Sequence, residues 1–173
     1  MTKLTIAVAV TGLIGAVGLC AAEKPVTVEL KDAKGASVGT AKISEAKGGK
    51  GVNIALNLKN LPAGDHAVHI HQNAKCEAPG FTTAGGHFNP DAKQHGTDNP
   101  MGPHAGDMPN FTVKPDGTAK ATVTDPRVDM GSDAHSIFTG GGTALMIHAT
   151  ADDMKTDPTG NAGARIACGT ITK

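Results

Sequence analysis

The stretch Val52-Asn53-Ile54-Ala55-Leu56-Asn57-Leu58-Lys59 places an apolar residue at every second position. Residues two apart share one face of a β-strand, so this stretch predicts a strand with one buried face. Seven other short segments after Pro25 show a similar pattern, namely residues 26–30, 38–44, 67–71, 111–114, 119–124, 143–149 and 165–172. No segment of helical length carries apolar residues at i, i+3, i+4 and i+7. The chain is therefore predicted to be all-β.

Eight strands in a chain of 173 residues suit one domain, either a sandwich or a barrel. Turn-forming residues separate most of the strands, as at residues 61–65, but two connections are much longer. These are residues 73–110 and 150–164, both rich in Gly, Pro, Asp and Asn. Connections of this length in a compact domain are usually functional or disordered. The first of these connections contains three histidines, which favours a functional role for it over disorder.

Composition excludes some classes of partner. The 16 basic and 16 acidic side chains balance, so the chain lacks the extended positive surface that nucleic acid or an acidic membrane would require. Aromatic residues make up only 2% of the chain, which leaves no stacking platform for single-stranded nucleic acid. Eight histidines in so small a protein instead direct attention to metal binding.

The N-terminus is typical of a secretory signal peptide. Lys3 precedes an uncharged apolar run over residues 4–19, which small residues follow as far as Ala22. We expect residues 1–22 to be removed and residues 23–173 to form the mature domain, without stable membrane association. A retained transmembrane anchor is the alternative, although the run is short for a bilayer core of about 30 Å. Lipidation at Cys20 is a second alternative, although Leu19 directly precedes this cysteine, where lipoprotein signals prefer a small residue.

Removal of the signal peptide leaves two cysteines, Cys76 and Cys168. In an exported protein such a pair is expected to form a disulfide, because the compartment is oxidising. Two buried free thiols are the alternative. The bridge would close a long loop and stabilise the fold by about 4–5 kcal/mol in the chain-entropy model.

Histidines occur in three places that could come together. His69 and His71 lie in one predicted strand, and alternation points both imidazoles to the same face, about 7 Å apart. Two such residues can chelate one metal ion, but polar residues on the wet face of a strand recur with the same spacing. His148 ends another strand and could meet this pair, which would make an imidazole-only site.

The long loop offers a second set of donors. His87, His95, His104 and Asp107 lie close together in sequence, among glycines and prolines that can fold the loop around an ion. Three nitrogen ligands and one oxygen ligand suit tetrahedral Zn²⁺.

These motifs together resemble the bacterial, exported copper/zinc superoxide dismutases. The resemblance covers nearly all of the mature region and rests on five ordered elements. They are His69-Ile70-His71, Gly85-Gly86-His87-Phe88-Asn89-Pro90, His95 with His104 and Asp107, the isolated His148, and Gly160-Asn161-Ala162-Gly163-Ala164-Arg165-Ile166-Ala167-Cys168-Gly169. The family's fold is an eight-stranded antiparallel Greek-key barrel. The resemblance implies a periplasmic enzyme, either a monomer or a homodimer, with superoxide as its substrate and antioxidant defence as its role.

The resemblance also implies one copper and one zinc ion per subunit. His69, His71, His87 and His148 would bind copper, and His87, His95, His104 and Asp107 would bind zinc, so that His87 bridges the two. Copper would be reduced by one superoxide and reoxidised by the next, which yields O₂ and hydrogen peroxide, and His87 would supply one proton. Asp152 would hydrogen-bond one ligand of each metal. Arg165 would guide the anion to copper.

Other features leave alternatives open. The family's animal members carry a lysine before the Thr-Gly-Asn-Ala-Gly run, where this chain has Pro158, so the steering role of any lysine, Lys155 included, is unassigned. His66 and His135 are interpreted as structural. A periplasmic protein that carries copper and zinc without turnover is a second hypothesis, but it would need neither Arg165 nor Asp152. A zinc hydrolase is a third, but it would need an open position on zinc.

Overall fold

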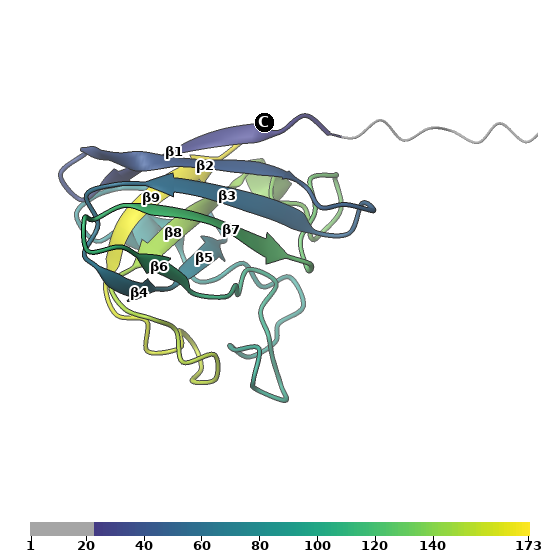
Figure 1. Cartoon of the computed structure of the whole chain (residues 1–173). Helices are drawn as coiled ribbons and strands as arrows, with labels where there is room; N and C mark the ends of the chain where they lie inside the picture. The colour runs from purple at the N-terminus through teal and green to yellow at the C-terminus, as the bar shows by residue number, and fades with distance from the viewer. Residues whose placement is uncertain (1–22) are drawn as a thin grey trace, which may run out of the picture.

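The computed structural model describes residues 23–173, so the predicted signal peptide over residues 1–22 lies outside the described residues. The described chain folds into antiparallel strands that curl into a barrel, with long loops gathered along one side of it, below β4, β5 and β6 in the view of Figure 1. The strands are β1 (Val26–Asp32), β2 (Ser37–Glu45), β3 (Val52–Leu58), β4 (Gly64–His66), β5 (Val68–His71), β6 (Phe111–Val113), β7 (Ala119–Asp125), β8 (Thr143–His148) and β9 (Arg165–Ile171). Two single-turn 3-10 helices, η1 (Thr82–Ala84) and η2 (Thr139–Gly141), lie in connections.

Seven strands form one sheet in the order β5-β8-β9-β1-β2-β3-β7, and β4 pairs with β6. The prediction placed residues 61–65 in a turn and missed β4. The chain changes partners at Ala67, whose amide donates to Thr150 O and whose carbonyl accepts from His148 N. Segments β4 and β5 therefore form one bent strand that belongs to both sheets. Counted in this way the barrel has eight strands, and the predicted fold class is confirmed.

Alternation decides which strand faces are buried. In β3 the residues Val52, Ile54, Leu56 and Leu58 are buried and join the interior cluster, while those between them are more exposed. Strands β5 and β8 differ, because every residue in them is buried. Their inner face joins the main core through Ile70 and Leu145. On the outer face of β8, Ala144 and Met146 pack against Phe81 and Ala84 of the long loop.

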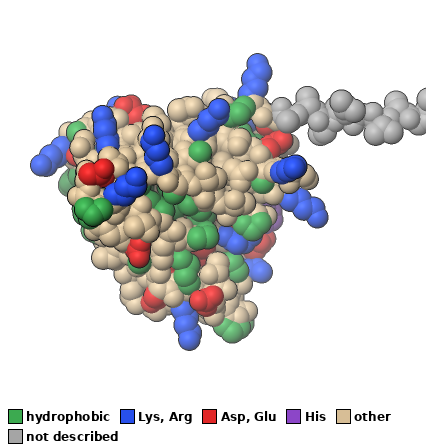
Figure 2. Space-filling model, in the orientation of Figure 1, with side chains coloured by type: hydrophobic (Ala, Val, Ile, Leu, Met, Phe, Trp, Pro, Cys, Tyr) green, Lys and Arg blue, Asp and Glu red, His purple; other side chains and the backbone are tan. Residues whose placement is uncertain are grey.

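Because both faces of β5 are buried, its histidines are not exposed to solvent. His69 and His71 share one face of β5, as alternation predicted. It is the outer face of the barrel, but the long loops cover it and leave the two residues 0% and 1% exposed. Lysine and arginine side chains are interspersed with acidic ones over the face in Figure 2, on which histidine scarcely shows. No helix within residues 23–173 is long and apolar enough to cross a membrane.

Candidate metal centre

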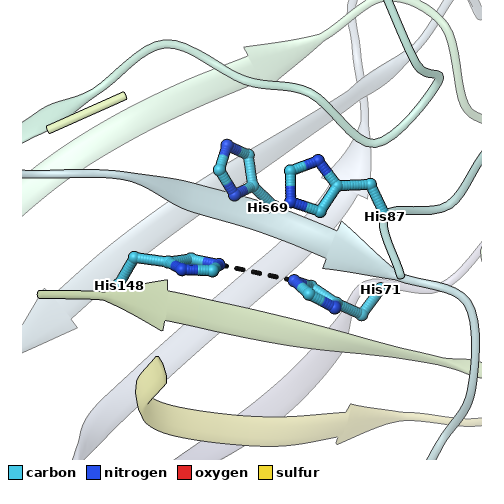
Figure 3. A group of neighbouring side chains, drawn as sticks. All are labelled: His69, His71, His87 and His148. Carbon is cyan, nitrogen blue, oxygen red and sulfur yellow. Dashed lines mark hydrogen bonds between the residues drawn. The ribbon is translucent and has the colours of Figure 1, made fainter. Parts of the chain in front are cut away.

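Four imidazoles meet where β5, β8 and the long loop adjoin (Figure 3). One ligand nitrogen from each of His69, His71, His87 and His148 lies within 4.8 Å of the other three. His71 and His148 come from paired strands, and their Nε2 atoms are 3.4 Å apart. His87 is brought alongside by an antiparallel bridge to His71. Three of them, His69, His71 and His148, are the residues that the sequence grouped as an imidazole-only site, and the family resemblance implied the fourth, His87.

A second group adjoins the first and consists of His87, His95, His104 and Asp107, all buried. Three Nδ1 atoms converge on Asp107 Oδ1, at 2.8 Å from His87, 3.0 Å from His95 and 3.2 Å from His104. The Nδ1 atom of His87 is also 3.3 Å from that of His95. Ligands about 2.0–2.1 Å from a tetrahedral ion lie roughly 3.3 Å from one another. The four atoms are therefore spaced like the ligands of one zinc ion.

In three imidazoles of the first group, those of His69, His71 and His148, the outward nitrogen faces an oxygen that can only accept. His71 Nδ1 donates to Gly85 O at 2.9 Å, and His148 Nδ1 is 3.3 Å from Gly163 O. His69 Nε2 donates to Asp152 Oδ2 at 2.7 Å. The proton is thereby fixed on the outward nitrogen, which leaves the lone pair of the other nitrogen directed inward, as metal binding requires.

Two of the inward nitrogens indicate whether the group is suited to a metal ion. His69 Nδ1 and His87 Nε2 are buried and have no hydrogen-bond partner among the described residues. An unsatisfied polar atom in the interior costs free energy, and a cation bound by both atoms would remove that cost. The donor set therefore fits a bound metal ion.

Burial keeps the four imidazoles of the first group uncharged. Burial lowers the pKa of His71 to about 2, helped by the nearby His87, and it lowers the pKa of both His87 and His148 to about 4. Burial lowers the pKa of His69 as well. At neutral pH these imidazoles are therefore uncharged, with one ring nitrogen free of a proton, which is the form that binds metals.

The second group is organised by charge instead. Burial opposes a proton on His95, but hydrogen bonds to Asp107 and Asp152 outweigh it and raise the pKa to about 9. Burial likewise acts to raise the pKa of Asp107, yet hydrogen bonds from His104, His87 and His95 hold it well below its usual value. Asp107 is thus an anion, and a bound cation would displace the proton of His95.

Asp152 joins the two groups, in the place that the resemblance implied. Its Oδ2 accepts from His69 and its Oδ1 accepts from His95 Nε2 at 3.0 Å. The sequence did not reveal what holds Asp152 itself. Asn110 accepts from the Asp152 amide and donates to the Asp152 carbonyl, both at 2.9 Å. A lone asparagine after a long loop carries no signal for this role.

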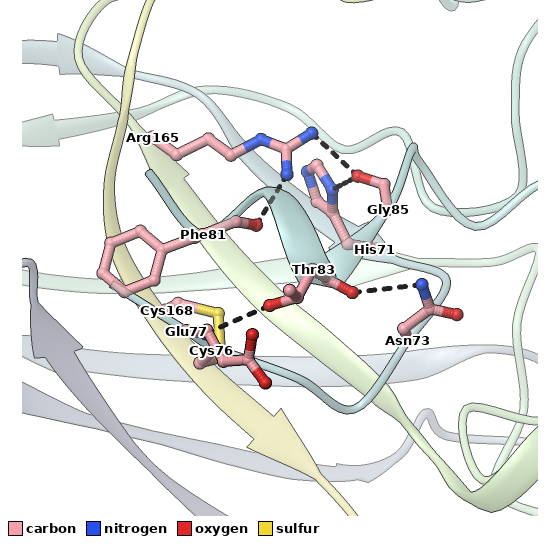
Figure 4. Close-up of a disulfide and its surroundings, with 9 residues drawn as sticks. All are labelled: His71, Asn73, Cys76, Glu77, Phe81, Thr83, Gly85, Arg165 and Cys168. Carbon is pink, nitrogen blue, oxygen red and sulfur yellow. Dashed lines mark hydrogen bonds between the residues drawn. A yellow bond between two sulfur atoms is a disulfide. The ribbon is translucent and has the colours of Figure 1, made fainter. Parts of the chain in front are cut away.

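Arg165 begins β9 and pairs with His148 across the sheet. Its guanidinium donates to Phe81 O and Gly85 O, each at 2.7 Å (Figure 4). Because Gly85 O also accepts from His71, the cation is held beside the first group. Burial lowers the pKa of Arg165, but an arginine remains charged at neutral pH.

The disulfide between Cys76 and Cys168 is present, with Cα atoms 5.6 Å apart, so this prediction is confirmed. It joins the loop that provides the two carbonyls to the strand that carries Arg165 (Figure 4). The bridge and the guanidinium hydrogen bonds therefore fix the same contact between loop and barrel.

The two histidines interpreted as structural lie outside both groups. His66 Nδ1 is 2.8 Å from His148 O, and its Nε2 is 2.8 Å from Pro62 O. His135 lies 3.0 Å from Asp91 at the surface. His66 thus ties a loop to the end of β8.

Gly160 allows the second long loop to lie over Asp152. A Cβ at this position would overlap Asp152 Oδ1, and it would lie 2.6 Å from His95 Nε2. We therefore expect Gly160→Ala to lower the free energy of unfolding by about 1–3 kcal/mol, as overpacking does, and to weaken metal retention. Denaturant titration and metal analysis measure the two effects.

Gly140→Ala is a matched control. Gly140 has φ 61°, close to the 64° of Gly160, but nothing lies within 4 Å of its Cβ position. The control therefore contains the backbone strain without the overlap. Equal destabilisation by the two variants, with metals retained in both, would contradict the role given to Gly160.

An antiparallel barrel that carries two adjoining donor groups with one shared imidazole belongs to the class of proteins with two candidate metal sites side by side. The family model described as copper/zinc superoxide dismutase (SODC) matches residues 37–171. The chain belongs to this family. Superoxide is therefore its substrate, dismutation its reaction, and copper and zinc its metals.

Named relatives and solved structures agree with this assignment. A copper–zinc superoxide dismutase of Aquifex aeolicus is 48% identical over 145 residues, which cover 83% of this chain and 84% of the relative. Another, of Caulobacter vibrioides, is 37% identical over 84% of each chain. The crystal structure of a SOD-like protein from Bacillus subtilis is 39% identical with a TM-score of 0.80, over 84% of this chain and 97% of the other. The Cu/Zn superoxide dismutase from Brucella abortus is 31% identical with a TM-score of 0.69, over 86% of this chain and 99% of the other.

Proposed function

We propose that the two donor groups divide the family's two metals between them. The imidazole-only group would hold copper through His69, His71, His87 and His148. The group with a carboxylate would hold zinc through His87, His95, His104 and Asp107. Nitrogen ligands suit copper, and three nitrogens with one oxygen suit zinc.

One observation carries this proposal. His87 belongs to both groups, with Nδ1 among the second set of ligands and an unpartnered, buried Nε2 on its other side. An imidazole that has lost both ring protons can bind one cation at each nitrogen. His87 would therefore provide one nitrogen to each ion.

Copper supplies one-electron redox chemistry when bound, and zinc is redox-silent and supplies fixed positive charge. Arg165, beside the first group, attracts and orients the superoxide anion with its remaining N–H donors. His87 would hold a proton at Nε2 between the two half-reactions and donate it to the reduced product. Asp152 keeps His69 and His95 in the required tautomers and orientation, which couples the two groups mechanically.

We also propose export to the periplasm, with residues 1–22 as the signal peptide and residues 23–173 as the mature enzyme. The apolar run after Lys3 supports export. The Cys76–Cys168 bridge supports it independently, because structural disulfides persist in oxidising compartments.

Metal analysis of two variants tests the assignment. We expect His104→Ala to lose most of its zinc and to keep its copper, because His104 belongs only to the second group. His71→Ala should lose copper and keep zinc for the converse reason. His135→Ala, which changes a surface histidine, is the control and should retain both metals. If His104→Ala and His71→Ala lose the same metal, the division into two sites is wrong.

A further inference from the structure

Two residues with ionisable side chains, at the end of β7 and just beyond it, take no part in the scheme above. Asp125 ends β7 and is fully buried, and Arg127 follows two positions later with its side chain 27% exposed. Asp125 Oδ1 accepts from the Arg127 amide at 3.0 Å and lies 3.2 Å from Arg127 Nη2. Asp125 Oδ2 and Arg127 Nε are buried without a hydrogen-bond partner among the described residues. A pair that remains partly unsatisfied adds little net stability by itself.

The guanidinium also reaches the second donor group. Arg127 Nη2 donates a hydrogen bond to the main-chain carbonyl of Asp107. The side chain of Asp107 faces the other way, where Oδ1 meets three imidazoles and Oδ2 accepts from the amides of Gly96 and His104. Arg127 therefore contacts the backbone of the residue that provides the only oxygen ligand of that group.

The position of this contact in the fold gives it importance. Asp107 forms an isolated bridge with His69 of β5, so one side of its main chain is attached to that strand. Strands β5 and β7 are the two ends of the seven-stranded sheet and do not pair with each other. Arg127, just beyond β7, attaches Asp107 from the second side. The main chain of Asp107 is thus held between the two edges of the sheet.

We propose that Arg127, oriented by Asp125, is a positioning residue that holds the Asp107 carboxylate in the zinc-binding group. The proposal rests on the metal assignment above. It goes beyond that assignment because it predicts a selective effect on zinc retention from a residue that touches neither metal group's imidazoles. Asp125 contributes by keeping the guanidinium directed at the Asp107 carbonyl.

Zinc release from the fully loaded protein tests the proposal. In Arg127→Gln we expect zinc transfer to a chromophoric chelator to be about tenfold faster, as for other residues that orient metal ligands, while copper release is unchanged. Arg127→Lys keeps the charge and should recover part of the difference. The visible spectrum of Co²⁺ bound in place of zinc should change in Arg127→Gln, because it reports the ligand arrangement directly.

Two controls separate positioning from general effects. Lys120→Gln removes one positive charge from an exposed position on β7, the strand that precedes Arg127, and should behave as the wild type. Ile54→Val weakens the core at β3, a strand that provides no residue to either donor group, and should not favour release of one metal over the other. Parallel acceleration of copper and zinc release in Arg127→Gln would overturn the proposal, as would zinc release no faster than in Lys120→Gln. If His104→Ala retains zinc, the metal assignment fails instead, and this inference fails with it.

Discussion

Arg165→Glu is expected to lower the second-order rate constant of superoxide dismutation at least about tenfold while both metals remain bound. The guanidinium of Arg165 is the cation next to the imidazole-only group, whose histidines are uncharged at neutral pH. Replacing it with a carboxylate converts local attraction of an anion into repulsion. Pulse radiolysis measures the rate constant, and metal analysis of the same sample measures the content.

Graded substitutions distinguish charge from structure. Arg165→Gln should fall between wild type and Arg165→Glu, and the difference between variants should shrink as ionic strength rises, because salt screens charge. Lys59→Glu makes the same reversal at an exposed position at the end of β3 and should have a much smaller effect. A rate constant unchanged in Arg165→Glu would remove this residue from the site.

Much of the fold could be predicted because strand alternation is a local property. Residues 52–59 and 143–149 each show which positions face the core, and the structure places these strands within one residue of the predicted ends. Strand β4 was missed because Gly64 and Asp65 favour a turn locally, and only pairing with β6 makes the segment a strand. Tertiary contacts here override local preference.

The ligand residues could be proposed because their side-chain types and order carry a chemical signal, whereas their supporting residues carry none. Asn110 and Gly160 act through contacts with Asp152 across the fold, and nothing in their sequence neighbourhood indicates this. Arg127 is one of two arginines in the chain, which by itself indicates no role. Its contact with the Asp107 carbonyl depends on how the loop closes between β5 and β7, which a sequence pattern does not encode.

The second large effect concerns stability. Removing the disulfide with Cys76→Ser and Cys168→Ser together is expected to lower the free energy of unfolding by about 4–5 kcal/mol. The bridge joins residues 92 positions apart, and without it the unfolded chain gains the freedom of that whole loop. Denaturant titration should compare metal-free samples of both proteins, because metals that bind the native state would add stability of their own.

Reduced wild type is the control for the side chains themselves. Cys168 is 2% exposed and packs with Phe81 and Met146, so serine at this position buries a hydroxyl and adds a cost that is unrelated to the bridge. Reduced wild type lacks the bridge but keeps the thiols, and its stability should lie between those of the oxidised protein and the double variant.

Since the bridge also fixes the loop whose Phe81 and Gly85 carbonyls hold Arg165, the remetallated double variant should show a lower rate constant even where it is fully folded. A stability change below about 1 kcal/mol would mean that the reduced, unfolded chain is already compact enough for the bridge to remove little freedom.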